Sequence, residues 1–124
     1  MKKQDLLRNI SVSLIVVLGI SMMLFRPHRA QADSPRIIEI TAKRFEFSPN
    51  KITLKKGETV TLHLTSADVT HGFFLRPLKI DTVISPDKPT DLTVTPETAG
   101  TFTTICDHFC GVNHGNMKMT IVVE

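Results

Sequence analysis

The segment CDHFCGVNHGNM, residues 106–117, holds two Cys, two His and one Met within twelve positions. From it, Cys110, His114 and Met117 offer a thiolate, an imidazole and a thioether. A second imidazole comes from His71, which begins a separate apolar run. A thiolate, two imidazoles and a thioether form the ligand set of trigonal copper sites that transfer electrons. These residue types therefore predict a copper site, with one loop presenting three ligands and a distant strand bringing the fourth.

A second thiolate, Cys106, precedes Cys110 by four residues. Two thiolates that face each other across a small site could bridge two metal ions, because a thiolate sulfur is a soft ligand with several lone pairs. The residues leave both a mononuclear copper site, using Cys110 alone, and a binuclear site open. The number of copper ions per chain distinguishes them.

Other interpretations of the same residues also stay open. Two Cys in a secreted domain often form a disulfide. Cys106, Cys110, His71 and His114 also match a Cys2His2 zinc site, in which Met117 would be core. A copper protein for delivery or storage would use similar ligands and would release Cu(I) readily to a partner.

Charge argues against a nucleic-acid partner. The whole chain carries a formal net charge of +3. Residues 33–124 hold ten Lys and Arg against eleven Asp and Glu, which gives −1, so the positive balance belongs to residues 1–32. A phosphate-binding surface needs clustered basic residues on the folded domain itself.

The N-terminal part, residues 1–32, is expected to be a signal peptide or a membrane anchor. Residues 10–25 form an uncharged apolar run after Lys2, Lys3 and Arg8. Its length lies between that of a signal-peptide core and a membrane span. The following Ala30-Gln31-Ala32 has the form of a cleavage site. Either interpretation predicts that residues 33–124 lie outside the cytoplasm, in a periplasm or on the outer face of the membrane.

Residues 33–124 alternate as strands do, with apolar and polar side chains at a period of two. Clear runs lie at 38–41, 60–65, 92–95 and 117–123, and turn-forming residues separate them at 48–50, 56–58, 85–89 and 96–100. Short strands with such spacing indicate an all-β fold, as an antiparallel sandwich or barrel. We expect the bulk of the core to come from the six Phe of this region: Phe45, Phe47, Phe73, Phe74, Phe102 and Phe109.

The pattern C-x3-C-G-x2-H-x2-M, with the upstream segment Asp68-Val69-Thr70-His71-Gly72-Phe73, resembles the copper A domain of cytochrome c oxidase subunit II. Further matches are Thr65-Ser66, Lys79-Ile80-Asp81, Ala99-Gly100 and the final Thr120–Val123. The resemblance covers residues 37–124. It implies a Greek-key β-sandwich of the cupredoxin type with the metal at one end.

The resemblance also implies the role of each ligand. Cys106 and Cys110 would bridge two copper ions, and His71, His114 and Met117 would be terminal ligands. The backbone carbonyl of His108 would complete the set. Most members have Glu at position 108, so the role of that Glu side chain, ligating a separate non-redox metal, does not carry over.

The implied function is one-electron transfer through a binuclear copper centre. The partners would be an electron donor such as cytochrome c and the catalytic subunit of a heme–copper oxidase or another terminal reductase. The chain itself would make and break no substrate bonds. Any oxidase activity would belong to a complex with a heme-bearing subunit.

Overall fold

The computed structural model describes residues 34–124. The leader expected over residues 1–32, and the domain boundary expected after it, lie outside these described residues. The strands are β1 (Arg36–Lys43), β2 (Glu46–Ser48), β3 (Lys51–Leu54), β4 (Val60–Ser66), β5 (His71–Leu75), β6 (Ile80–Ile84), β7 (Thr90–Val94), β8 (Gly100–Ile105) and β9 (Lys118–Val123). Two short 3-10 helices, η1 (Arg76–Leu78) and η2 (His114–Asn116), join them. Neither is long and apolar enough to span a membrane.

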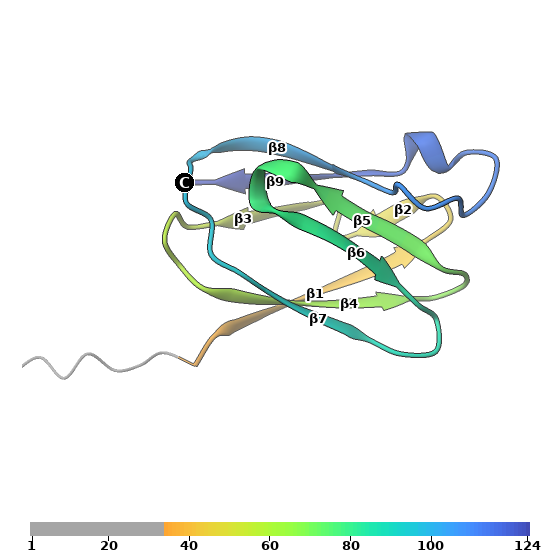
Figure 1. Cartoon of the computed structure of the whole chain (residues 1–124), viewed down its shortest axis with the longest axis horizontal. Helices are drawn as coiled ribbons and strands as arrows, with labels where there is room; N and C mark the ends of the chain where they lie inside the picture. Colours follow the sequence, from red (N-terminus) through yellow and green to blue (C-terminus); the bar gives the residue numbers. More distant parts are fainter. Residues whose placement is uncertain (1–33) are drawn as a thin grey trace, which may run out of the picture. The chain divides into compact units, whose positions relative to one another are not determined.

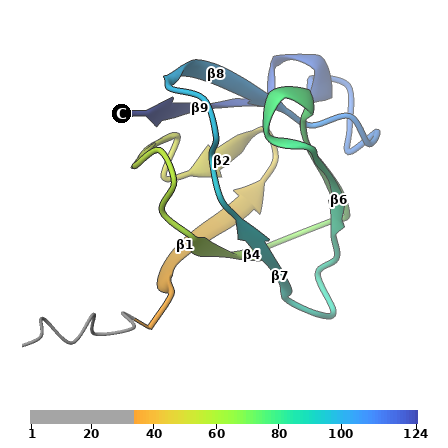
Figure 2. The same cartoon turned by 60° about the vertical axis from the view of Figure 1, so that its left-hand side comes forward.

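The strands form two sheets that pack face to face. One sheet has the order β2-β1-β4-β7 and the other β3-β9-β8-β5-β6. Figure 2 shows β8 and β9 in one layer and β1, β4 and β7 in the other. The expected all-β sandwich is therefore confirmed.

The alternating runs bury the faces that their period predicts. Val60, Leu62 and Leu64 of β4 are fully buried, and the residues between them are half-buried. In β9, Met119, Ile121 and Val123 enter the core. Met117, which precedes β9, continues the same buried series towards the ligand loop. The strand that returns from this loop thus carries core residues, and a candidate ligand directly precedes it.

The expectation of antiparallel pairing is wrong for two strand pairs. β1 pairs parallel to β4, and β3 pairs parallel to β9. Each parallel pair joins strands that are distant in the sequence, with the chain crossing between the two sheets in the intervening segment. Side-chain alternation reports which face of a strand is buried but carries no information about the direction of its neighbour.

The Phe residues contribute unequally to the core. Phe47 and Phe73 are buried and meet edge to face across the two sheets, with ring centroids 5.4 Å apart. Phe45 and Phe102 pack against the core while partly exposed. Phe109 is 70% exposed, so the expectation that it fills the core is wrong. It sits between two candidate ligands in a loop that covers the end of the sandwich, where its ring has no second sheet to enter.

Candidate metal centre

Three segments meet at one end of the sandwich (Figure 1). They are the β1–β2 turn, the connection from β4 to β5, and the long loop between β8 and β9. The loop is closed at its base, where the Cys106 backbone N–H donates to the Met117 carbonyl at 3.1 Å. This hydrogen bond continues the β8–β9 pairing, and it holds the two ends of the ligand loop together.

The two thiols lie side by side and are buried. Cys106 Sγ is 3.5 Å from Cys110 Sγ, far longer than the ~2.05 Å of a disulfide bond, and both cysteines are free. The ligand atoms of His71, Cys106 and Cys110 all lie within 4.8 Å of one another. The structure therefore brings a distant strand and the loop to a single point, as the spacing predicts.

His71 is fully buried, and its side chain is held by Asp68. The distance between His71 Nε2 and Asp68 Oδ1 is 2.7 Å. The backbone N–H groups of Arg44 and Val69 donate to the same carboxyl, at 2.9 and 2.7 Å. Burial opposes ionisation of Asp68, but the hydrogen bonds from Arg44 and His71 outweigh it and lower its pKa to about 2.

The ionised carboxylate determines which nitrogen of His71 is available to a metal. A carboxylate only accepts hydrogen bonds, so Nε2 must carry the hydrogen in this pair. In neutral imidazole the other nitrogen then holds a lone pair. His71 Nδ1 is that atom, and it is buried without a hydrogen-bond partner in the part of the chain that the structure describes. A carboxylate that orients a ligating imidazole in this way is a recurring feature of metal sites.

His114 and Met117 complete the surroundings of the thiols. Met117 is fully buried, with its Sδ 3.9 Å from Cys110 Sγ. His114 lies outside the group of atoms within 4.8 Å, but its Nδ1 is also buried without a partner. Its ring meets that of Phe109 edge to face, with centroids 5.2 Å apart. An unpaired buried polar atom is costly, and residues 34–124 contain two such imidazole nitrogens, Nδ1 of His71 and Nδ1 of His114.

His108 is placed by its backbone. Its carbonyl oxygen lies 3.1 Å from Cys106 Sγ, while its side chain is exposed. The carbonyl is thus close to the thiols, and the imidazole is not part of the cluster. Met119 is core, with 1% of its surface exposed.

The sequence analysis assigned no role to two neighbours of the site, Arg44 and Gly72. The Arg44 Nε donates to the Cys110 carbonyl at 2.7 Å. The Gly72 N–H points at Cys106 Sγ at 3.4 Å, and a Cβ at position 72 would lie 2.6 Å from the His108 backbone nitrogen. Gly72 stands next to His71 in the motif, so a glycine requirement was visible there. Nothing in the sequence pointed to Arg44, which is 66 residues from its partner.

The chemistry of this donor set fits copper. Burial, and to a lesser extent a hydrogen bond with the neighbouring Cys106 thiol, raises the pKa of Cys110 to about 11. A metal must therefore displace a proton to bind at Cys110. Two thiols, a thioether and two unpaired imidazole nitrogens are soft and borderline donors that suit copper in both oxidation states.

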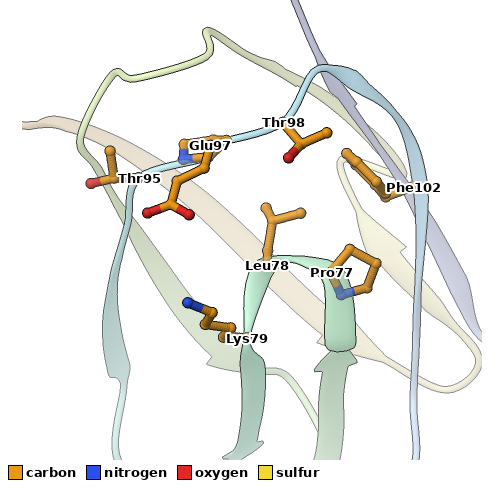
Figure 3. Close-up of a pocket in the computed structure, with 8 residues that line it drawn as sticks. Pro77, Leu78, Lys79, Thr95, Glu97, Thr98 and Phe102 are labelled. Atoms are coloured by element: carbon orange, nitrogen blue, oxygen red, sulfur yellow. The ribbon is translucent and has the colours of Figure 1, made fainter.

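A separate cavity lies at the end of β5 opposite His71, and its lining does not include the metal-binding side chains described above. This cavity of about 120 Å³ is bounded by η1 and the segment between β7 and β8. Figure 3 shows Leu78 and Pro77 below Thr98 and Phe102, with Lys79 and Glu97 at one side. Its lining contains no thiol, imidazole or thioether.

Comparison with known proteins agrees with this picture. The family model described as a cupredoxin-like domain matches residues 14–123. A nitrous-oxide reductase of Cupriavidus necator is 33% identical over 91 residues, covering 70% of this chain and 14% of that protein. A cytochrome c oxidase subunit 2 of Thermus thermophilus is 32% identical over 87 residues, covering 70% of this chain and 64% of that protein. The chain thus spans less than two thirds of either relative.

A solved structure shares the fold. The periplasmic domain of subunit II of the cytochrome oxidase of Bradyrhizobium japonicum aligns with a TM-score of 0.66 at 19% identity. The alignment covers 72% of this chain and 83% of that one. With the family match over most of its length, this chain belongs to the cupredoxin-like family, and its resemblance to cytochrome c oxidase subunit II is confirmed.

Proposed function

We propose that this chain transfers single electrons through a binuclear copper centre, as a protein like subunit II of cytochrome c oxidase. Cys106 and Cys110 bridge the two ions in this proposal. His71, His114 and Met117 are the terminal ligands, and the His108 carbonyl completes the set.

The observation that carries the proposal is the pair of free thiols 3.5 Å apart, beside two buried imidazole nitrogens that have no partner. A mononuclear site needs one thiolate, and a second buried thiol in contact with it would have no role. A disulfide would leave His71 Nδ1 and His114 Nδ1 unpaired, with nothing to offset the cost of their burial.

A copper pair in this position would supply one-electron oxidation and reduction. The chain contributes a site that changes little between the two states. The loop is closed by the hydrogen bond from Cys106 to Met117, and His71 is fixed by an ionised carboxylate. Ligands held in place by surrounding hydrogen bonds need little rearrangement when the charge of the metal changes.

The proposed partners follow from the relatives and from the surface near the loop. The curated relatives are named as a subunit 2 of cytochrome c oxidase and as a nitrous-oxide reductase. The acceptor proposed here is accordingly the catalytic subunit of a heme–copper oxidase or another terminal reductase. Phe109 and Val112, exposed on the ligand loop, offer an apolar contact for an electron donor such as cytochrome c.

We further propose an extracytoplasmic location. The related solved domain is described as periplasmic, and the expected leader over residues 1–32 would direct the domain there. Sequencing the N-terminus of the mature protein would show whether residues 1–32 are removed after Ala32 or retained as an anchor. A cytoplasmic protein with an intact leader would contradict this part of the proposal.

Metal content tests the centre itself. The purified protein, loaded with copper, is expected to hold two copper ions per chain by elemental analysis. The Cys106→Ser variant removes one bridging sulfur and should hold fewer than two, while Cys110→Ser should also lose the thiolate shared with the mononuclear alternative. One ion per chain in the wild-type protein would establish a mononuclear carrier.

Two other outcomes would indicate a different function. Retention of zinc in preference to copper would indicate a structural site. Rapid transfer of Cu(I) to a chelator, without fast exchange of electrons with a redox partner, would indicate a copper-handling protein.

The proposed oxidase complex has its own test. Recovery of the chain from native membranes together with a heme protein would support the oxidase role, and repeated recovery as a free chain would contradict it.

A further inference from the structure

Arg44 lies in the β1–β2 turn and contacts both segments that carry the metal ligands. Its backbone N–H donates to Asp68 Oδ2 at 2.9 Å, and Asp68 in turn holds His71. Its side-chain Nε donates to the carbonyl of Cys110 at 2.7 Å. Arg44 thus links the segment before β5 to the middle of the ligand loop. Cys110 lies 66 positions after Arg44 in the sequence.

The two contacts differ in what they require of the residue. Any amino acid except proline has the backbone N–H that reaches Asp68. Only a side chain with a suitably placed N–H donor can reach the Cys110 carbonyl. A charged donor makes a stronger hydrogen bond than a neutral one, and its planar guanidinium gives it a fixed direction.

The residue after Cys110 packs against the residue after Arg44. Gly111, next to Cys110, has a φ of +143° and lies against the Phe45 ring, where a Cβ would be 2.8 Å from a ring carbon. Arg44, Phe109, Cys110 and Gly111 also line a shallow groove on this end of the molecule. The Arg44–Phe45 pair therefore forms the wall against which the loop rests.

We propose that Arg44 is a positioning residue of the metal centre, whose guanidinium fixes the Cys110 segment and places a positive charge beside the bridging thiolates. The redox part of this inference rests on the proposed function. The positioning part concerns the loop itself and can be measured without metal.

Arg44→Met tests the inference, because it keeps a long side chain and removes both the donor and the charge. Lys43→Met is the matched control: it removes the charge of the neighbouring exposed residue, which makes no side-chain hydrogen bond among the described residues. Arg44→Lys keeps the charge with a less directional donor.

The first readout is alkylation of Cys110 in the metal-free protein, followed by mass spectrometry. Cys110 is 4% exposed, so the reagent reaches it only when the loop opens. Losing the hydrogen bond should raise the alkylation rate about tenfold in Arg44→Met, with a smaller rise in Arg44→Lys and none in Lys43→Met. Urea unfolding of each variant measures its global stability. The part of any rise in the alkylation rate that global unfolding explains can then be subtracted.

The second readout is the reduction potential of the copper-loaded protein. The potential should fall in Arg44→Met, because a nearby positive charge favours the reduced, less positive metal. It should stay near the wild-type value in Arg44→Lys and Lys43→Met. If Arg44→Met does not fold, Arg44→Lys decides the positioning claim through its alkylation rate.

The inference is overturned if Arg44→Met matches Lys43→Met in both readouts, or if its alkylation rises no more than global unfolding explains. Failure of the proposed function is a separate result. A wild-type protein that holds one copper or none would contradict the binuclear centre, and the alkylation rates would still decide whether Arg44 positions the loop.

Discussion

Replacing Gly72 by Ala should disturb the candidate metal centre without replacing any of the proposed ligands. Gly72 lies in β5 beneath the first part of the ligand loop. A Cβ there would overlap with Asp107 Oδ1, and it would be 2.6 Å from the His108 nitrogen and 2.8 Å from the Asp107 nitrogen. The exposed Asp107 side chain can rotate away, but the two backbone nitrogens cannot move without the loop.

The distances set the size of the effect. Ordinary contacts to a Cβ begin at 3.4 Å, so the backbone at residues 107 and 108 must shift by 0.6 to 0.8 Å, from 3.4 − 2.8 and 3.4 − 2.6. Overpacking of this kind typically costs about 1–3 kcal/mol. For a domain of this size, each kcal/mol lowers the melting temperature by about 4–8 °C. The same shift should disturb the 3.1 Å contact between the His108 carbonyl and Cys106 Sγ.

Gly115→Ala is the control, because a Cβ at position 115, in the same loop, meets nothing within 4 Å. Urea unfolding should show Gly72→Ala less stable by about 1–3 kcal/mol and Gly115→Ala changed by less than about 0.5 kcal/mol. Gly72→Ala should also release copper to a chelator faster than Gly115→Ala does. Equal stability and equal release in the two variants would refute the packing of the loop on β5.

Three further results are expected. Asp68→Asn removes the charge that holds His71 and should weaken copper binding about 10- to 100-fold in competition with a chelator; unchanged affinity would mean that the pair does not orient the ligand. Because burial raises the pKa of Cys110 from 9.0 to about 11, the neutral thiol stabilises the metal-free fold fully below pH 9.0, and this contribution is lost as the pH rises through 11. Urea unfolding between pH 9.0 and about 11 should show the free energy of unfolding fall in the wild-type protein, and fall less in Cys110→Ser. An equal fall in both proteins would contradict this role of the Cys110 thiol. Phe109→Ala should change the unfolding free energy by less than about 0.5 kcal/mol, whereas Phe73→Ala, at a fully buried position, should lower it by about 3–5 kcal/mol, and similar losses would contradict the exposure of Phe109.

The alternation of side chains predicted the buried faces of the strands well. Leu62 and Met119 are inside because each lies on the apolar face of a period-two run. The parallel partners of β1 and β3 could not be read in the same way, since alternation gives a face and not a neighbour. Phe109 was misplaced because residue type alone favours burial, whereas its position in a loop over the sandwich end decides its exposure.

The candidate ligands were visible because their types are rare and their spacing is short. The residues that hold these ligands in place were not visible in the sequence. Asp68 was noted only as part of the segment that carries the resemblance, and its contact with His71 depends on the backbone bend between β4 and β5. The bond from Arg44 to Cys110 depends on two elements meeting at one end of the fold, which no local pattern encodes.

Electron paramagnetic resonance of the oxidised, copper-loaded protein tests the central claim most directly. A binuclear centre bridged by Cys106 and Cys110 shares one unpaired electron between two metal nuclei. The spectrum should then show hyperfine structure from both nuclei, and this sharing should disappear in Cys106→Ser. Hyperfine structure from a single copper nucleus in the wild-type protein would contradict the account.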